Sequence, residues 1–174
     1  VIDRASPIPA LDIAACDKIM DRFDRLRNAN GGTPTAILRD KMQRTMQEDA
    51  AVFRTQESLE SGCKRMSEIW KELPDIKVTD RSMIWNSDLV ETLELENLIE
   101  VAKATMISAN ARTESRGAHV RDDAPDTPEH PNGRDDANWL KHSLWYREGN
   151  RLEYKPVNLK PLTVESVALK TRAY

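Results

Sequence analysis

Hydrophobic residues recur every three or four positions in four stretches of the chain. Residues 11–29, 34–53 and 56–73 each carry one apolar stripe between polar positions. This spacing is typical of amphipathic helices. The longest stretch, 87–112, is apolar on more than one side, which favours a helix that lies centrally in a bundle or beneath another domain. We therefore predict a mostly α fold.

Local signals place the ends of the predicted helices. The stripe of the first helix consists of Leu11, Ala15, Ile19, Phe23 and Leu26. The sequence NGG at 30–32 ends that helix, because glycine readily adopts the left-handed conformation found after helices. Thr33 suits an N-cap and Pro34 a first turn, so the second helix should begin there. Pro74 closes the third helix, since a proline disfavours helical geometry in the residue before it.

The C-terminal third has a different pattern. Residues 121–138 hold three prolines, one glycine and a surplus of acid, which predicts a loop. Two β-prone runs in 139–157 flank the turn sequence REGN and predict a hairpin, and 158–174 should form an extended tail. We predict three parts: a helical bundle domain over 1–120, the acidic proline-rich loop, and a hairpin with tail over 139–174. The bundle should be antiparallel, with three shorter helices and one long central helix, because the connections between the first three helices are short.

Composition narrows the class of protein. The net charge of -3 argues against broad nucleic-acid binding, which needs a basic surface. No run of eighteen apolar residues occurs, so we expect neither a transmembrane helix nor a signal peptide. Cys16 and Cys63 are far apart in helix-like patterns and are interpreted as reduced thiols. The chain begins at Val1 without a methionine, and we interpret it as a piece of a longer protein.

Common catalytic and binding motifs are missing. The six glycines do not form a G-x-G-x-x-G or P-loop pattern, so no nucleotide cradle is expected. The three histidines, at positions 119, 130 and 142, lack the spacing of a zinc site, and neither cysteine has an adjacent histidine to activate it. The acidic side chains of the long helix favour a solvated or partner-facing edge over acid–base chemistry. These are Glu91, Glu94, Glu96 and Glu100. We predict no catalytic, cofactor-binding or metal-binding residue in this chain.

A dense group of charges follows the long helix in the sequence NARTESRGAHVRDD, residues 110–123. Arginine, histidine and carboxylate groups together can grip a carboxylate substrate or donate protons. They can equally form a structural corner, in which glycine lets the chain turn while the charges pair and cap the helix. The spacing favours the structural corner. Its members are Arg112, Glu114, Arg116, Gly117 and His119.

Several of these segments, in this order, resemble the C-terminal part of the succinate dehydrogenase and fumarate reductase flavoprotein family. The resemblance rests on NGGTPTAILRDKMQRTMQEDAAVFR, on LELENLIEVAKATMISANARTESRGAHVRDDAP, on RDDANWLKHSL, and on YKPV with a tail ending in TRAY. It covers about the whole chain. The hairpin sequence NWLKHSL and the tail ending in Tyr174 are more similar to succinate dehydrogenase than to fumarate reductase or L-aspartate oxidase.

The resemblance implies a role in respiratory complex II. The parent subunit would carry covalent flavin adenine dinucleotide (FAD), oxidise succinate to fumarate, and pass electrons to iron–sulfur centres and quinone. The residues that bind the flavin and the substrate would all precede Val1. Implied partners are the flavin-binding domain of the same subunit, the iron–sulfur subunit and a flavinylation assembly factor, with no nucleic acid. The parent would be peripheral on the cytoplasmic face of a bacterial inner membrane or the mitochondrial matrix side, and this piece would be soluble and inactive alone.

Two alternatives remain open. The chain could be the corresponding domain of a fumarate reductase or an L-aspartate oxidase, or it could be a free-standing helical interaction module. An enzyme complete in itself is the weakest interpretation, because no residue set has the spacing that common chemistry needs. Under the main interpretation, the corner residues Arg112, Glu114, Arg116, Gly117 and His119 lie at the interface with the flavin-binding domain.

Overall fold

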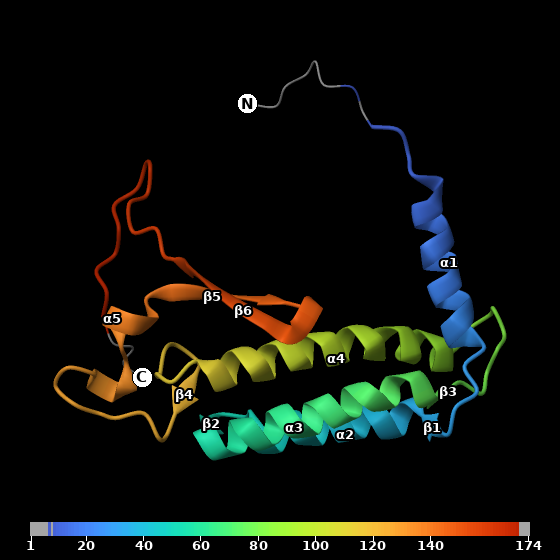
Figure 1. Cartoon of the computed structure of the whole chain (residues 1–174), viewed down its shortest axis with the longest axis horizontal. Helices are drawn as coiled ribbons and strands as arrows, with labels where there is room; N and C mark the ends of the chain where they lie inside the picture. The colour runs from blue at the N-terminus through green and yellow to red at the C-terminus, as the bar shows by residue number, and fades with distance from the viewer. Residues whose placement is uncertain (1–6, 8, 171–174) are drawn as a thin grey trace.

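The computed structural model describes residue 7 and residues 9–170, and most of its regular structure is helical (Figure 1). The long helices are α1 (Ile13–Arg27), α2 (Thr35–Asp49), α3 (Gln56–Glu72) and α4 (Ser87–Ala111). They confirm the mostly α class. Each helix overlaps one predicted helix, and α3 and α4 match the prediction most closely at both ends.

The ends of α3 and α4 are set by side-chain caps. Thr55 and Ser58 form a reciprocal capping box at the start of α3, in which each side chain accepts a hydrogen bond from the other residue's backbone N–H. The side chain of Asn86 accepts from the backbone N–H of Leu89 at 2.8 Å and so caps α4. As predicted, α3 ends next to Pro74, which lies in a short 3-10 turn, η1 (Leu73–Asp75).

The predicted start of α2 is wrong in one respect. Thr33 does not cap the helix, because Thr33–Pro34 is a short strand, β1, that pairs in parallel with β3 (Ile76–Lys77). The Thr33 hydroxyl instead donates to the Asp75 carboxylate at 3.3 Å. The chain before β1 runs very close to that segment, since a Cβ added to Gly31 would lie 2.0 Å from the Asp75 carbonyl oxygen. Tertiary pairing therefore decided the conformation here.

The hydrophobic core lies between α2, α3 and α4, which run side by side in Figure 1. Its fully buried side chains include Leu38, Leu59, Met66, Leu95, Ile99 and Met106. One polar pair is buried with them: the hydroxyls of Thr35 and Thr92 lie 2.6 Å apart. A second parallel pair, β2 (Phe53–Arg54) with β4 (Val120–Arg121), lies at the end of the helices opposite β1 and β3 (Figure 1).

The first helix does not pack along the others as the predicted four-helix arrangement requires. Of its apolar stripe, Leu26 is buried and Phe23 is partly buried, but Leu11 and Ile19 are 82% and 67% exposed. In Figure 1, α1 projects away from the remaining helices, and only its C-terminal end meets α4. An amphipathic pattern identified the helix correctly but did not identify what its apolar face contacts.

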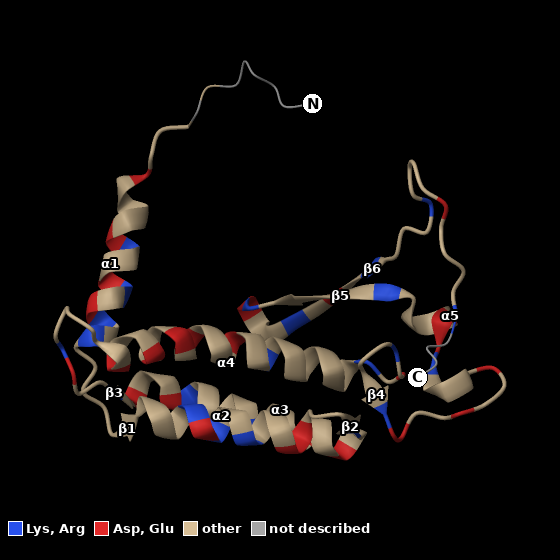
Figure 2. Ribbon diagram, turned by 180° about the vertical axis from the view of Figure 1, so that it is seen from behind, with Lys and Arg blue, Asp and Glu red and all other residues tan. Residues whose placement is uncertain are grey.

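Ion pairs anchor α1 to α4. The carboxylate of Glu96 accepts from Arg22 Nε at 2.7 Å and from Arg25 Nη2 at 2.8 Å. Figure 2 shows Lys, Arg, Asp and Glu interspersed along the helices, with both signs on each of α1 and α4. Glu96 is therefore occupied by this chain's own arginines, and the predicted solvated edge of α4 is partly an internal contact.

After α4, the chain forms β4, the 3-10 turn η2 (Pro131–Gly133), the short helix α5 (Asp136–Trp139), and strands β5 (Lys141–Tyr146) and β6 (Arg151–Pro156). The two strands pair antiparallel around the 3-10 turn η3 (Glu148–Asn150) and lie across α4 (Figure 1). The segment predicted as a loop thus contains η2 and the start of α5. The described part of the tail, 158–170, has neither helix nor strand, and Tyr174 lies outside the described residues.

Among the described residues, no helix combines the length and the apolar character needed to cross a lipid bilayer.

Candidate functional site

The chain reverses sharply after α4 at a turn over residues 116–119. Gly117 has a φ of +60°, a conformation that costs other residues free energy. The turn is closed by two backbone hydrogen bonds, from Arg116 N–H to His119 O at 2.8 Å and from His119 N–H to Arg116 O at 3.0 Å. This geometry explains the glycine in the sequence SRGAH and returns His119 to the end of α4.

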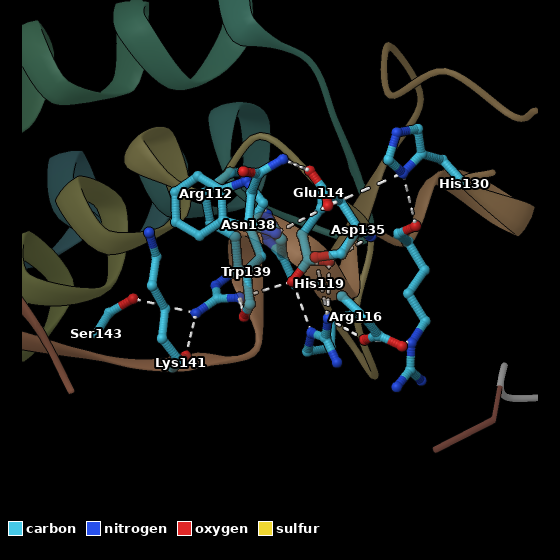
Figure 3. Close-up of polar contacts among 12 residues, drawn as sticks. Arg112, Glu114, Arg116, His119, His130, Asp135, Asn138, Trp139, Lys141 and Ser143 are labelled. Carbon is cyan, nitrogen blue, oxygen red and sulfur yellow. Dashed lines mark hydrogen bonds and ion pairs between the residues drawn. The ribbon is translucent and has the colours of Figure 1, made fainter. Parts of the chain in front are cut away.

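Glu114 is the centre of the charged corner and is only 1% exposed (Figure 3). Its Oε1 atom accepts from Arg112 Nη1 at 2.7 Å and from Arg116 Nε at 2.6 Å. Its Oε2 atom accepts from Arg116 Nη2 at 3.0 Å and from the backbone N–H of Asp135 at 2.7 Å. A buried carboxylate is costly unless it is paired and hydrogen-bonded, and here both oxygens are fully engaged.

Arg112 joins the corner to the β-hairpin. Besides its bond to Glu114, it donates to the carbonyls of Trp139 at 3.0 Å and Lys141 at 2.8 Å, and to the hydroxyl of Ser143 at 3.3 Å (Figure 3). Its guanidinium also lies 4.9 Å from the centre of the Trp139 ring. Arg112 therefore fixes the strand β5 relative to the end of α4.

Arg116 joins the corner to α5. Its Nη2 atom lies 2.7 Å from Asp136 Oδ1, which also binds Arg134 Nε at 2.9 Å. The hydrogen bond to Glu114 raises the pKa of Arg116 above its usual value, although partial burial opposes this. The contact with Asp136 raises it as well. Although partial burial favours the neutral acid, Arg134 and Arg116 together hold the pKa of Asp136 below its usual value. Arg116 is thus a permanently charged link between two carboxylates.

His119 is held as a neutral imidazole. Its Nδ1 atom lies 2.8 Å from Arg54 Nη1, and because a guanidinium can only donate, Nδ1 is the acceptor. The other ring nitrogen, Nε2, then carries the proton and donates to the Arg112 carbonyl at 3.1 Å. Burial lowers the pKa of His119, and the nearby charges of Arg54, Arg121 and Arg112 lower it further. Both ring nitrogens are occupied, so the side chain supports structure here.

Two further members of this corner were not among the predicted residues. Arg54 arrives through the pairing of β2 with β4, and its Nε atom donates to the carbonyls of Ala50 and Ala51 at the end of α2. Arg121, 5% exposed, donates to the Arg112 carbonyl and pairs with Asp123 at 2.7 Å. The run of charges at 110–123 includes Arg121 and so indicated its place in the corner. No local sequence pattern connects Arg54 to the corner.

The predicted corner residues Arg112, Glu114, Arg116, Gly117 and His119 are thus brought together by the fold. Within residues 7 and 9–170, no group of three or more His, Cys, Asp or Glu side chains has the arrangement of a metal site. Cys63 is half-buried and Cys16 exposed, and both are free thiols. Both oxygens of Glu114 and both ring nitrogens of His119 are engaged within this chain, and the corner connects α4, the hairpin and α5.

Comparisons with known proteins identify the relatives of this chain. A family model described as the fumarate reductase flavoprotein C-terminal region matches residues 39–174. The chain is 52% identical over 168 residues to the mitochondrial succinate dehydrogenase [ubiquinone] flavoprotein subunit of Oryza sativa subsp. japonica, covering 94% of this chain and 26% of that protein. It is 50% identical to the succinate dehydrogenase flavoprotein subunit of Rickettsia felis, covering 97% of this chain and 28% of that one.

Solved structures give the same relationship. A mutant quinol fumarate reductase from Escherichia coli superposes with a TM-score of 0.78 at 33% identity, over 92% of this chain and 27% of that chain. The chain therefore spans only about a quarter of the length of the relatives it matches.

Proposed function

The chain belongs to the fumarate reductase flavoprotein C-terminal family, and from that premise we propose that it is the helical C-terminal domain of a succinate dehydrogenase flavoprotein subunit. In the whole subunit it would support the FAD-dependent oxidation of succinate to fumarate, with electrons passing to iron–sulfur centres and quinone. The observation that carries the proposal is the identity of about half of all positions to succinate dehydrogenase subunits over nearly the whole chain. The fumarate reductase alternative has weaker support, since the E. coli flavoprotein is 37% identical.

We place the FAD site outside this chain. In the described residues, the space next to the paired glycines is filled by the chain itself. A Cβ on Gly31 would meet the backbone of Asp75, and one on Gly32 would lie 3.1 Å from the Asp75 carboxylate. A carboxylate beside the glycines repels a pyrophosphate, which needs free backbone N–H groups. These residues therefore do not fit a flavin dinucleotide.

The proposed role is to brace the flavin-binding domain. Helix α4 exposes Val90 and Val101, at 54% and 65%, on the side away from the core. The connector before it exposes Met83, Ile84 and Trp85, and Trp85 is 98% exposed. Such clustered apolar side chains are uncommon on a free surface and fit a region covered by more protein. The iron–sulfur subunit and an assembly factor for flavin attachment would be further partners of the complete subunit, at the surface of the respiratory membrane.

We further propose that the charged corner, Arg112, Glu114, Arg116, Gly117 and His119, lies at the interface with that domain and outside the reaction centre. The oxygens of Glu114 and the ring nitrogens of His119 are all hydrogen-bonded within this chain, which suits a rigid support. The antiparallel order of α2, α3 and α4, and the hairpin lying on α4, are parts of the same proposal. They are supported by the short connection between α2 and α3 and by the pairing of β5 with β6. The division of the chain into the three segments 1–120, 121–138 and 139–174 also belongs to this proposal.

The test uses the whole subunit carrying Arg116→Ala, with Arg44→Ala as a matched control on an exposed i,i+4 pair. We expect Arg116→Ala to lower the yield of folded, flavin-loaded subunit, while the loaded fraction keeps its turnover of succinate. Flavin absorbance, kcat and KM for succinate measure this. If the variant folds, keeps its flavin and its KM, yet loses hydride transfer, the corner is catalytic and the proposal is wrong.

A further inference from the structure

A surface pocket of about 410 Å³ lies where the C-terminal end of α4 meets β2 and β5. Its lining contains the cationic side chains Arg54, Arg112 and Lys141, with hydroxyls from Ser108 and Ser143. No acidic side chain lines it among the described residues, although the whole chain carries a net charge of -3. The positive lining is therefore a local arrangement and not a consequence of composition.

Arg54 lines this pocket, and part of its guanidinium has no hydrogen-bond partner among the described residues. Its Nε atom is bound to the carbonyls of Ala50 and Ala51, at 3.1 and 2.8 Å, and Nη1 is bound to His119 Nδ1. Its Nη2 atom has no hydrogen bond to any described residue, and Arg54 forms no ion pair with any of them. Partial burial lowers the pKa of Arg54, so the charge is incompletely solvated. These three hydrogen bonds hold the guanidinium in one orientation before any ligand arrives.

The charge balance of the pocket favours an anion. Arg112 is paired with Glu114, whose carboxylate Arg116 shares, and Arg54 and Lys141 form no ion pair with a carboxylate of the described residues. The ends of α2 and α4 oppose them with about half a negative charge each. The surplus is therefore at least about one positive charge. This matches a single carboxylate better than a phosphate dianion, which would meet those same helix C-termini unfavourably.

We propose that this pocket binds a carboxylate group, with the Nη edge of Arg54 as its anchor and the Ser108 hydroxyl as an additional donor. A planar guanidinium edge binds a carboxylate through two parallel hydrogen bonds. Lys141, whose Nζ atom lies over the rings of Trp139 and Tyr154 at 4.5 and 4.2 Å, adds a further positive charge to the lining. The carboxylate comes either from a small free acid or from an Asp or Glu side chain in the part of the subunit outside this chain. The pocket itself is argued from this chain alone and does not depend on the proposed function.

The first experiment titrates the 174-residue chain with sodium acetate, using sodium chloride at equal ionic strength as the reference. The Arg54 Nε–H and Ser108 N–H signals in ¹H–¹⁵N spectra report binding. We expect saturable shifts with acetate that chloride does not reproduce. Arg54→Gln should weaken the apparent affinity about tenfold or more, because it removes charge-assisted hydrogen bonds. Arg44→Gln, an exposed arginine on α2, should leave the affinity unchanged.

A second variant separates loss of binding from loss of folding, which Arg54→Gln could also cause because Arg54 caps α2. Lys141→Gln leaves those contacts intact and should weaken acetate binding several-fold, whereas Lys155→Gln on the neighbouring strand should not. Equal shifts in acetate and chloride would overturn the proposal, as would an Arg54→Gln chain that folds and binds acetate as tightly as the parent chain.

The full-length subunit separates the two sources of the carboxylate. If the ligand is a free acid, the Arg54 signal moves with acetate as it does in the 174-residue chain. If an acidic side chain of the subunit fills the pocket, the signal already lies at the acetate-bound position and does not move. A signal that stays at the ligand-free position in the full-length subunit and does not respond to acetate would also overturn the proposal.

Discussion

Arg116 grips Glu114 with two nearly parallel hydrogen bonds, Nε to Oε1 at 2.6 Å and Nη2 to Oε2 at 3.0 Å, although the residues are only two positions apart. The turn at Gly117 is compatible with this bidentate pair, because it leaves the Arg116 side chain beside the buried carboxylate of Glu114. Bidentate pairs of this kind add geometric specificity to charge compensation. The pair therefore fixes both the charge and the direction of the chain after α4.

Glu114→Gln should be strongly destabilising. The amide removes the negative charge that compensates Arg112 and Arg116, and its NH₂ group faces groups that can only donate hydrogen bonds. Removing one partner from a buried ion pair costs about 3–5 kcal/mol. Urea unfolding of the chain, followed by circular dichroism, measures the change in the free energy of unfolding.

The matched control is Glu94→Gln, which removes the partner of Arg39 from a pair in which the Glu94 side chain is 56% exposed. Exposed pairs contribute about 0–1 kcal/mol, so this variant should unfold close to the parent chain. Similar losses in the two variants would mean that the corner is no more buried in solution than the helix surface.

Gly117→Ala should destabilise the chain through the backbone alone. The space around Gly117 is open, because a Cβ added there would have no atom within 4 Å, but the φ of +60° is unfavourable for alanine. The expected cost is about 1–2 kcal/mol in the free energy of unfolding. Gly117→Asn should cost less, because asparagine tolerates this conformation. An alanine variant as stable as the parent would show that the turn adopts another geometry in solution.

Asp123 should contribute to the loss of stability in acid. Arg121 holds the pKa of its carboxyl at about 2, below the usual 3.8, and the backbone N–H of Gln56 assists. A lowered folded-state pKa gives stability that is present above pH 3.8 and lost as the pH falls toward 2. The difference in unfolding free energy between the parent chain and Asp123→Asn should therefore be constant near neutral pH and shrink below about pH 4. A difference that does not change down to pH 2 would contradict this assignment.

His119 should make the free energy of unfolding depend on pH in a higher pH range than Asp123 does. Burial and three neighbouring arginines lower its folded-state pKa below the usual 6.5. As the pH falls, the unfolded chain is therefore protonated at this residue before the folded chain is. The contribution of His119 to the free energy of unfolding is fully present above pH 6.5 and decreases as the pH falls from there toward the folded-state pKa. NMR titration of the His119 ring measures that pKa directly, and His119→Gln should flatten this part of the stability profile. A ring pKa above 6.5 would show that His119 is not neutral between Arg54 and the Arg112 carbonyl.

The charged corner shows how far sequence reasoning reaches. The density of charge around Gly117 predicted that Arg112, Glu114 and Arg116 would pair, because all lie within a few residues. Arg54 could not be found in the same way, since it lies 65 positions before His119 and arrives only through the pairing of β2 with β4. Two-residue parallel strands leave no period in a sequence. The Thr33 cap was wrong for a related reason, because β1 pairs with β3 and takes Thr33 out of the helix start.

The same difference between local and long-range features applies to the fold as a whole. Helical periodicity predicted all four long helices, because it depends on spacing within each segment. It could not predict which apolar stripe would be covered. The stripe of α1 is as regular as that of α3, yet α1 is attached only near its C-terminal end, by Leu26 in the core and by the ion pairs of Arg22 and Arg25 with α4. Packing between elements depends on the whole set of competing surfaces, of which a part lies outside this chain if the proposed function is correct.

The position of α1 gives the last prediction. Because Ile19 is 67% exposed, Ile19→Ser should change the free energy of unfolding by no more than about 0.5 kcal/mol in this chain. Leu26→Ala, at the buried end of the same helix, should cost about 2–5 kcal/mol, since it leaves a cavity in the core. Urea unfolding of both variants provides the comparison. A large loss for Ile19→Ser would mean that α1 folds back onto the other helices in solution, as the apolar stripe alone had predicted. In the full-length subunit the same substitution should become costly only if the flavin-binding part covers α1.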